Sequence, residues 1–301
     1  MYFLIKETLQ PCEKDDIKNK KCKYVAVLTS SEWKVEKDIF DFVIDLDLET
    51  SEILSTNADV NYDSLTGTFC IPNRQCLYEE QKFAFALDEN GIVFIDDSGV
   101  VEKMTKKIQA CRRWRFPSLE RFIYDFLDQI IKDDLRLMSS YERELGMMEN
   151  TIIADEELDP NRVNDMRGDI RDLKNHYEQL MDLGQTFEEN ENNFFKAENI
   201  RYFHLFLNRI ERLRDISSSI RDYTVQIQDF YKSHLDIKQN RIITVLTVIT
   251  SIGMPLNLVT GWFGMNFKYT SDLDWEYYVV IVLCIVIVLV CWFVFKKKKW
   301  L

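Results

Sequence analysis

Proline and glycine are scarce in this chain, which contains five prolines and nine glycines in 301 residues. No proline occurs between Pro160 and Pro255, and the run from Gly184 to Gly253 has no glycine inside it. These are the two residues that most often interrupt helices. Their absence predicts one long helix that starts at about Ala197 and continues into the apolar segment that follows.

Histidine is rarer still, and the chain has no phosphate-binding glycine-rich loop. Its three histidines, His176, His204 and His234, lie in charged stretches with helical periodicity. No nucleophile is accompanied by a general base. We therefore expect no enzymatic activity and no organic cofactor.

The cysteines number seven and none forms a CxxC pair, which argues against a zinc site or a disulfide framework. We expect free thiols in a reducing compartment. The apolar start, Met1 to Ile5, is too short for a secretory signal and lacks a basic leader, so we expect a cytoplasmic N-terminus. The seven are Cys12, Cys22, Cys70, Cys76, Cys111, Cys284 and Cys291.

Positive charge is in deficit, with a net charge of −12. Residues 1–240 contain 47 acidic and 32 basic residues, whereas the remainder contains three acidic and six basic ones. A nucleic-acid-binding surface is therefore not expected. The acidic part either attracts divalent cations or simply keeps the protein soluble.

Two long apolar segments lie near the C-terminus. The first, 241–263, has no charged residue after Arg241 and spans roughly 33 Å as a helix, enough to cross a bilayer. Polar groups in hydrocarbon are costly unless they face a partner or water, so this span is expected to line something. Its polar residues are Thr244, Thr247, Thr250, Ser251, Asn257 and Thr260.

The second apolar segment, 277–295, is almost purely valine, isoleucine and leucine and is typical of a lipid-facing helix. The basic tail, 296–301, begins with four lysines, Lys296–Lys299. Lys238 and Arg241 precede the first span, while only Lys268 lies between the spans. The positive-inside rule therefore predicts an integral membrane protein with two spans, both termini cytoplasmic and the 264–276 loop outside.

The region 1–116 predicts a cytosolic domain of mixed helix and strand. A helix is expected over Ser31–Asp41, and the Glu89-Asn90-Gly91 turn indicates a hairpin. Expected strands are Tyr24–Leu28, Phe42–Leu48, Gln81–Leu87 and Ile92–Ile95.

The region 117–240 is expected to be helical. One helix starts after Pro117 and includes Leu135, a second starts at about Asn161, and the polar run Glu188–Asn193 marks a bend. The long stalk follows, and its apolar positions recur at intervals of three and four. They are Phe206, Ile210, Leu213, Ile220, Tyr223, Ile227, Phe230 and Ile237.

The triplet Gly264-Met265-Asn266 closes the first span, and the second span ends near the C-terminus. This arrangement resembles the CorA family of magnesium and divalent-cation channels. The resemblance implies an α+β cytosolic domain, a stalk helix continuous with the first of two membrane helices, and a homopentamer. It also implies that Mg²⁺, with Co²⁺ or Ni²⁺, passes as a hydrated ion through a selectivity filter at Gly264, Met265 and Asn266.

A single polar-striped helix encloses no pore, whereas several copies around an axis do, so a homo-oligomer is expected. Inward residues should recur at intervals of three or four along the first span, with Leu246 and Thr247 as alternatives at one position. Leu246 and Met254 would form dry constrictions, and the amides and hydroxyls would offer hydrogen bonds. The expected pore-lining residues are Asn240, Ile243, Leu246, Thr250, Met254, Asn257 and Gly261.

Acidic residues in the outer loop, Asp272, Asp274 and Glu276, are expected to concentrate cations at the mouth. The resemblance also implies that cytosolic divalent cations regulate the channel, but the sequence assigns no carboxylate to that role. At Leu205, where an acid of the family is expected, the residue is apolar.

Two other functions remain open from the sequence. One is a zinc transporter of the ZntB type, which shares the Gly-Met-Asn triplet. The other is a membrane-anchored coiled-coil scaffold or sensor without ion flux, against which the polar first span argues.

Overall fold

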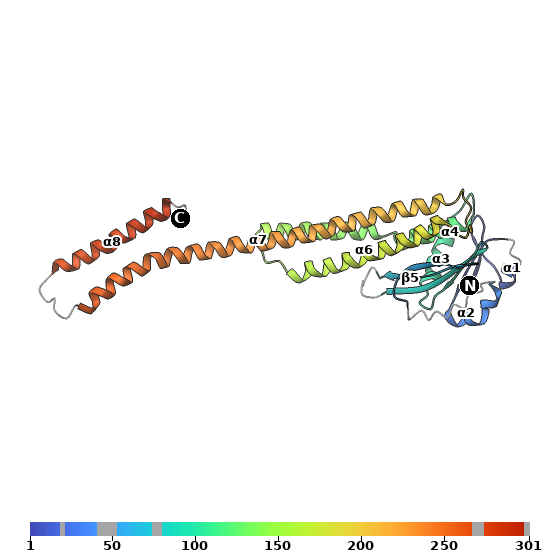
Figure 1. Cartoon of the computed structure of the whole chain (residues 1–301), viewed down its shortest axis with the longest axis horizontal. Coiled ribbons are helices and arrows are strands. Elements are labelled where there is room, and N and C mark those ends of the chain that lie inside the picture. The colour runs from blue at the N-terminus through green and yellow to red at the C-terminus, as the bar shows by residue number, and fades with distance from the viewer. Residues whose placement is uncertain (19–21, 41–52, 74–79, 267–273, 298–301) are drawn as a thin grey trace. The chain divides into compact units, whose positions relative to one another are not determined.

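The computed structural model describes residues 1–18, 22–40, 53–73, 80–266 and 274–297 (Figure 1). The chain divides into two compact units, Met1–Ile227 and Gln228–Leu301. The strand predicted over Phe42–Leu48 lies outside the described residues.

In the described part of the first unit, seven strands form one sheet in the order β2-β1-β3-β7-β6-β5-β4. The pair β3–β7 is parallel, and the pairs on either side of it are antiparallel. Three predicted strands are present with nearly the predicted bounds, and four further strands were not predicted. The strands are β1 (Tyr2–Ile5), β2 (Leu9–Pro11), β3 (Tyr24–Leu28), β4 (Asn57–Val60), β5 (Leu65–Pro72), β6 (Glu80–Leu87) and β7 (Gly91–Ile95).

The predicted hairpin joins β6 and β7, which pair antiparallel. The Asp88 side chain closes the turn, because its Oδ1 accepts hydrogen bonds from the backbone amides of Asn90 at 2.7 Å and Gly91 at 2.8 Å. An aspartate that satisfies the backbone of the next residues is a common way to fix a tight turn.

Short helices cover one face of the sheet: α1 (Lys14–Lys18), α2 (Ser30–Glu36) and the 3₁₀ turn η1 (Lys37–Ile39). Trp33 of α2 is buried there with Tyr24 of β3 and Phe40. The helix expected over Ser31–Asp41 is therefore too long. The chain tightens after Glu36 and becomes extended at Phe40, whose ring lies 6.0 Å from that of Trp33.

Longer helices cover the other face: α3 (Val100–Cys111), α4 (Leu119–Ile130) and α6 (Pro160–Glu189) (Figure 1). Phe126 of α4 is the centre of this layer. Its ring lies 4.5 Å from Phe94, 6.0 Å from Phe83 and 6.2 Å from Phe69, all on the sheet. One stacked and two edge-to-face aromatic contacts thus join α4 to the strands.

The helix expected to run from Pro117 through Leu135 is in fact two helices. Ser118 caps α4, which ends at Ile130, and α5 (Asp134–Ile153) begins after a turn. This break lets the buried Asp134 carboxylate accept a hydrogen bond from Tyr177 of α6 at 3.0 Å. Leu135 lies beyond the break and is 45% exposed.

The helix α6 starts behind the N-cap Asp159 and ends at Glu189. Asn190 follows with a left-handed backbone. Its side-chain amide donates a hydrogen bond to the backbone oxygen of Phe195 and accepts one from the backbone nitrogen of the same residue. The predicted bend therefore lies at the end of α6. The predicted apolar positions of this helix are all buried: Met166, Ile170, Leu173, Tyr177, Leu180 and Leu183.

The helix α7 (Arg201–Asn266) has 66 residues without a break (Figure 1). It begins later than the predicted Ala197, because the buried Glu120 carboxylate holds the preceding turn. Glu120 accepts hydrogen bonds from the Lys196 amide at 2.8 Å and the Asn199 side chain at 3.2 Å. In the predicted apolar stripe Phe206, Ile210, Leu213, Ile220 and Ile227 are buried, whereas Phe230 and Ile237 are exposed.

Acid should weaken the contact that joins α2 to β1. The Tyr2 hydroxyl donates a hydrogen bond to Glu36, and Lys14 lies 3.0 Å from the same carboxylate. These contacts, chiefly the one to Tyr2, hold the pKa of Glu36 below its ordinary value near 4.5. A carboxylate with a lowered folded-state pKa stabilises the fold above its unfolded pKa, and this contribution disappears as pH falls through the folded pKa.

As the pH falls below 4.5, we therefore expect the free energy of unfolding of Glu36→Gln to decrease less than that of the wild type. Chemical denaturation of both proteins across this range measures the difference. Tyr2→Phe is the matched variant and should flatten the same part of the profile. Parallel losses in all three proteins would contradict the assignment.

Candidate functional site

The second unit contains the last part of α7 and the helix α8 (Asp274–Lys297), and both are long and apolar enough to cross a membrane. The structure moves the predicted boundaries. α7 continues to Asn266, so Gly264, Met265 and Asn266 form its last turn and do not belong to a loop. α8 begins at Asp274 instead of residue 277.

The segment between α7 and α8 is consequently shorter than the predicted loop, 264–276. Asp274 is the first residue of α8, and Glu276 lies in its first turn. Asp272 falls outside the described residues. The acidic group expected at the mouth therefore includes the start of a helix, where negative side chains are favoured by the helix dipole.

The side chains predicted to line a pore share one face of α7, because they recur at intervals of three and four. In the single chain all of them are exposed: Asn240, Ile243, Leu246, Thr250, Met254, Asn257 and Gly261. Of the two alternatives at one position, Leu246 is 59% exposed and Thr247 is partly buried. A mixed polar and apolar face of this membrane-length segment is thus left uncovered.

A different face of α7 packs toward α8. Its partly buried residues include Thr244, Val248, Ser251, Ile252 and Pro255. The Cys291 thiol of α8 lies 3.9 Å from the backbone oxygen of Ser251. The helix α8 therefore contacts α7 at Ser251, on a side that does not carry the predicted pore-lining residues.

The threonines of this segment are bonded to their own helix. Thr244 donates to the backbone oxygen of Asn240 at 2.8 Å, Thr250 to Leu246 at 2.9 Å, and Thr260 likewise to the residue four positions earlier. This bonding satisfies the hydroxyl hydrogen inside an apolar environment. The oxygen lone pairs that remain can only accept hydrogen bonds.

Pro255 lies inside α7 and has no amide hydrogen. In a continuous helix that hydrogen would bond the oxygen of Ser251, four residues earlier. The Cys291 thiol approaches this same oxygen. A side chain from α8 therefore takes the place of the missing backbone donor.

The remaining sequence candidates lie elsewhere. His176 is buried within α6, and His204 pairs with Glu188 at 3.0 Å between Nδ1 and Oε1. Leu205 is 48% exposed. Within the described ranges, no three His, Cys, Asp or Glu residues gather to hold a metal ion.

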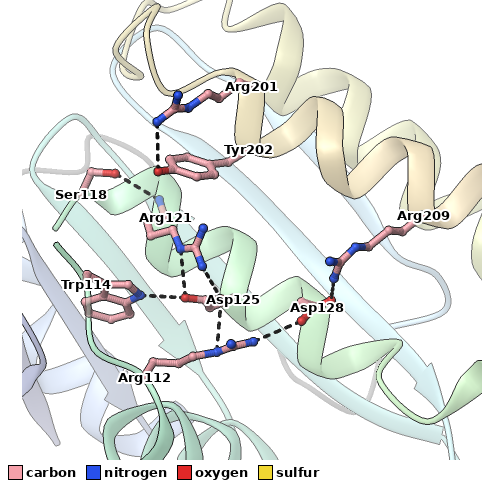
Figure 2. A network of polar contacts seen from close by, with 9 residues as sticks. All are labelled: Arg112, Trp114, Ser118, Arg121, Asp125, Asp128, Arg201, Tyr202 and Arg209. Carbon is pink, nitrogen blue, oxygen red and sulfur yellow. Dashed lines mark hydrogen bonds and ion pairs between the residues drawn. The ribbon is translucent and has the colours of Figure 1, made fainter. Parts of the chain in front are cut away.

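A buried polar network in the first unit was not predicted (Figure 2). The Asp125 carboxylate of α4 is fully buried, accepts a hydrogen bond from the Trp114 indole at 2.7 Å, and pairs with Arg112 and Arg121, each at 3.3 Å. Asp128, one turn further, pairs with Arg112 and with Arg209 of α7. The network thus joins the segment after α3 to α4 and to the start of α7.

Known proteins resemble this chain in sequence and in fold. A cobalt/magnesium transport protein CorA from Thermotoga maritima is 26% identical over 229 residues, which cover 74% of this chain and 65% of that protein. The solved CorA magnesium transporter from Methanocaldococcus jannaschii matches with a TM-score of 0.73 at 20% identity, over 93% of this chain and 92% of that one. A ZntB cytoplasmic domain from Vibrio parahaemolyticus matches with a TM-score of 0.56 at 9% identity, over 71% of this chain and 88% of that one.

The structural matches and the sequence matches support different conclusions. The two structural matches lie below 25% identity and show the fold, namely a soluble α+β domain followed by a long helix and a C-terminal apolar helix. In sequence, the chain spans 65% of the length of the Thermotoga maritima protein and 30% of a magnesium transport protein CorA from Helicobacter pylori. The model of the CorA-like Mg²⁺ transporter protein family matches residues 42–297, which is most of the chain. The chain therefore belongs to the CorA-like Mg²⁺ transporter family.

Proposed function

We propose that this chain is one subunit of a homo-oligomeric channel that conducts hydrated Mg²⁺ across a membrane. The observation that carries the proposal is the exposed face of α7 in an otherwise apolar span. Asn257 and Thr250 lie on this face and are exposed. Facing lipid, such groups would be costly, whereas around a shared axis they would line a water-filled path.

The chemistry of this face suits a hydrated cation. Mg²⁺ gives up its inner waters reluctantly, and those waters donate hydrogen bonds outward. The threonine oxygens, whose hydrogens are bonded within the helix, offer only lone pairs. Asn240 and Asn257 add amide oxygens, so the surface accepts hydrogen bonds from the ion's water shell.

We place the selectivity filter at Gly264, Met265 and Asn266. A ring of Asn266 amides would accept hydrogen bonds from the waters of the ion, while a carboxylate ring would release the ion more slowly. Because α7 ends at Asn266, its last carbonyl groups have no helical partners and carry partial negative charge. Both features favour a cation at the same end.

Bulky apolar side chains on the same face supply a gate. Leu246 is 59% and Met254 78% exposed, so in an oligomer each would form a ring around the axis. Apolar rings close a path when water leaves them. The pentamer is inferred from the family resemblance.

The membrane potential supplies the driving force. A divalent ion gains roughly 4.6 kcal/mol per 100 mV, at about 2.3 kcal/mol per charge, so inward movement requires no chemical energy source. With both termini cytoplasmic, Asp272, Asp274 and Glu276 lie outside and concentrate cations. We place regulatory divalent cations between the acidic cytosolic units of neighbouring subunits.

Ion flux into liposomes tests the proposal. The full chain is reconstituted with a magnesium-sensitive dye inside, and uptake is followed with Mg²⁺, Co²⁺, Ni²⁺ and Zn²⁺ outside, with and without an inside-negative potential. We expect Mg²⁺ uptake that rises with the potential. Zn²⁺ flux without Mg²⁺ flux would replace the proposal with zinc transport, and no flux with any cation would leave a membrane-anchored scaffold.

A further inference from the structure

A pocket of about 430 Å³ lies in the first unit, between the segment that precedes α4 and the segment that precedes α7. Phe116 and Ser118 line one side, and Lys196, Asn199 and Arg201 line the other. The ion path proposed above uses none of these residues. Its volume is within the range of pockets that bind small organic ligands.

The charge of the pocket is opposite to that of the chain. Lys196 and Arg201 are exposed, and in the part of the chain that the structure describes neither side chain pairs with a carboxylate. Arg201 contacts the neighbouring Tyr202, with 5.2 Å between the guanidinium and the ring centroid. One acidic residue, Glu198, lines the same pocket. The basic groups therefore remain available to an anion from solution.

Nearby arginines are engaged in a different way. Arg112, Arg121 and Arg209 all form ion pairs with Asp125 or Asp128, as Figure 2 shows, whereas Arg201 lies outside this pairing. Carboxylates thus neutralise the arginines of this network, whereas among the described residues neither Lys196 nor Arg201 has such a partner. Two neighbouring basic side chains that are not paired with carboxylates are an exception in a chain whose net charge is −12.

An aromatic surface and neutral polar groups complete the pocket. Phe116 is 70% exposed, and the Arg115 guanidinium lies 5.4 Å from its ring centroid. The Ser118 hydroxyl accepts a hydrogen bond from the Arg121 amide and keeps its own hydrogen to donate. The Asn199 amide nitrogen donates a hydrogen bond to Glu120, and the Asn199 amide oxygen can still accept one.

We propose that this pocket binds a nucleoside polyphosphate. Its phosphates would pair with Lys196 and Arg201, and its base would stack on Phe116, since every nucleobase has a face that stacks on an aromatic ring. The Ser118 hydroxyl and the Asn199 oxygen would bond the sugar or the phosphates. No glycine-rich loop is needed, because side chains supply the donors. This binding does not depend on ion conduction.

Calorimetric titration of the full chain in detergent tests the proposal. The buffer contains a chelator, so that divalent ions do not mask the phosphates. The ligands are ATP, inorganic tripolyphosphate and adenosine. We expect ATP to bind, and the double variant Lys196→Ala/Arg201→Ala to weaken ATP binding by at least about tenfold through the loss of charge-assisted hydrogen bonds.

Two further variants separate the parts of the ligand. Phe116→Leu should weaken ATP binding by about fivefold through lost stacking and leave tripolyphosphate binding unchanged. The matched control Arg136→Ala/Arg143→Ala removes the same charge from exposed positions on α5 and should bind ATP like the wild type. Thermal melting checks that each variant is folded.

The proposal is overturned if ATP does not bind at millimolar concentration. It is also overturned if the control double variant loses as much affinity as the pocket double variant, since binding would then reflect general charge. Equal ATP affinity in Phe116→Leu and the wild type would overturn recognition of the base. Because binding is measured without flux, a failure here is distinct from a failure of the channel proposal.

Discussion

Replacing Asn266 with alanine is expected to reduce Mg²⁺ uptake into liposomes on the order of a hundredfold. Each subunit would lose one amide oxygen at the end of α7, and the ion's water shell would lose several hydrogen bonds at once. At about 1 kcal/mol for each hydrogen bond, two or three of them account for an effect of this size. The dye-based uptake assay with a fixed inside-negative potential measures it.

Two variants make this result specific. Asn266→Gln keeps the amide on a longer side chain and should retain part of the flux. Asn208→Ala removes an exposed amide from the part of α7 that lies in the first unit and should conduct like the wild type. Flux in Asn266→Ala equal to that of the wild type, with equal amounts of inserted protein, would remove Asn266 from the filter.

Replacing Asp125 with alanine is expected to destabilise the protein by about 3 kcal/mol, because it leaves buried donors without an acceptor. Trp114 is 4% exposed, and its indole nitrogen would lose its partner at 2.7 Å. The side chains of Arg112 and Arg121 would also lose their ion pairs, although they are 41% and 28% exposed and can reach water. Without that access the loss would be larger.

A melting temperature measured by circular dichroism reports this loss. For a unit of this size we expect a decrease of about 6 to 12 °C. Asp165→Ala, at an exposed position of α6, is the matched control and should melt within about 2 °C of the wild type. An unchanged melting temperature in Asp125→Ala would show that the network in Figure 2 contributes little to stability.

The long helix could be predicted because its signals are local. Between Pro160 and Pro255 nothing in the sequence interrupts a helix, and the apolar positions recur at a helical period. The same periodicity identified the exposed face of α7. It did not reveal where α7 ends, because Gly264 and Asn266 are residues that often stop helices, yet they lie in its last turn.

The missed strands have weaker local signals. The edge strand β4 has a polar, mostly exposed sequence, and β5 contains Gly67, a residue that usually indicates a turn. The structure explains this glycine, since a β-carbon there would lie 2.2 Å from the backbone oxygen of Asn57 on β4. Such a close approach depends on the neighbouring strand, so the sequence of β5 alone does not reveal it.

The polar network escaped prediction for a related reason. Asp125 and Arg209 lie on α4 and α7, and Arg112 lies in the segment after α3. Each alone is an ordinary charged residue. Only their meeting in space distinguishes the buried Asp125 from the many solvated carboxylates of this acidic chain. The pocket that brings Lys196 and Arg201 close to Phe116 escaped prediction for the same reason.

The substitution of a thiol for the missing amide at Pro255 gives α7 one point of low stiffness. A sulfur donor 3.9 Å from the Ser251 oxygen holds more weakly than the backbone hydrogen bonds above and below it. Gly253, two residues away, adds backbone freedom at the same place. A rod that is otherwise free of such breaks for more than fifty residues will concentrate any bending or twisting load at this joint. A movement of the first part of α7 would therefore bend or twist the helix mainly between Leu246 and Asn257, the region that contains Gly253 and Pro255.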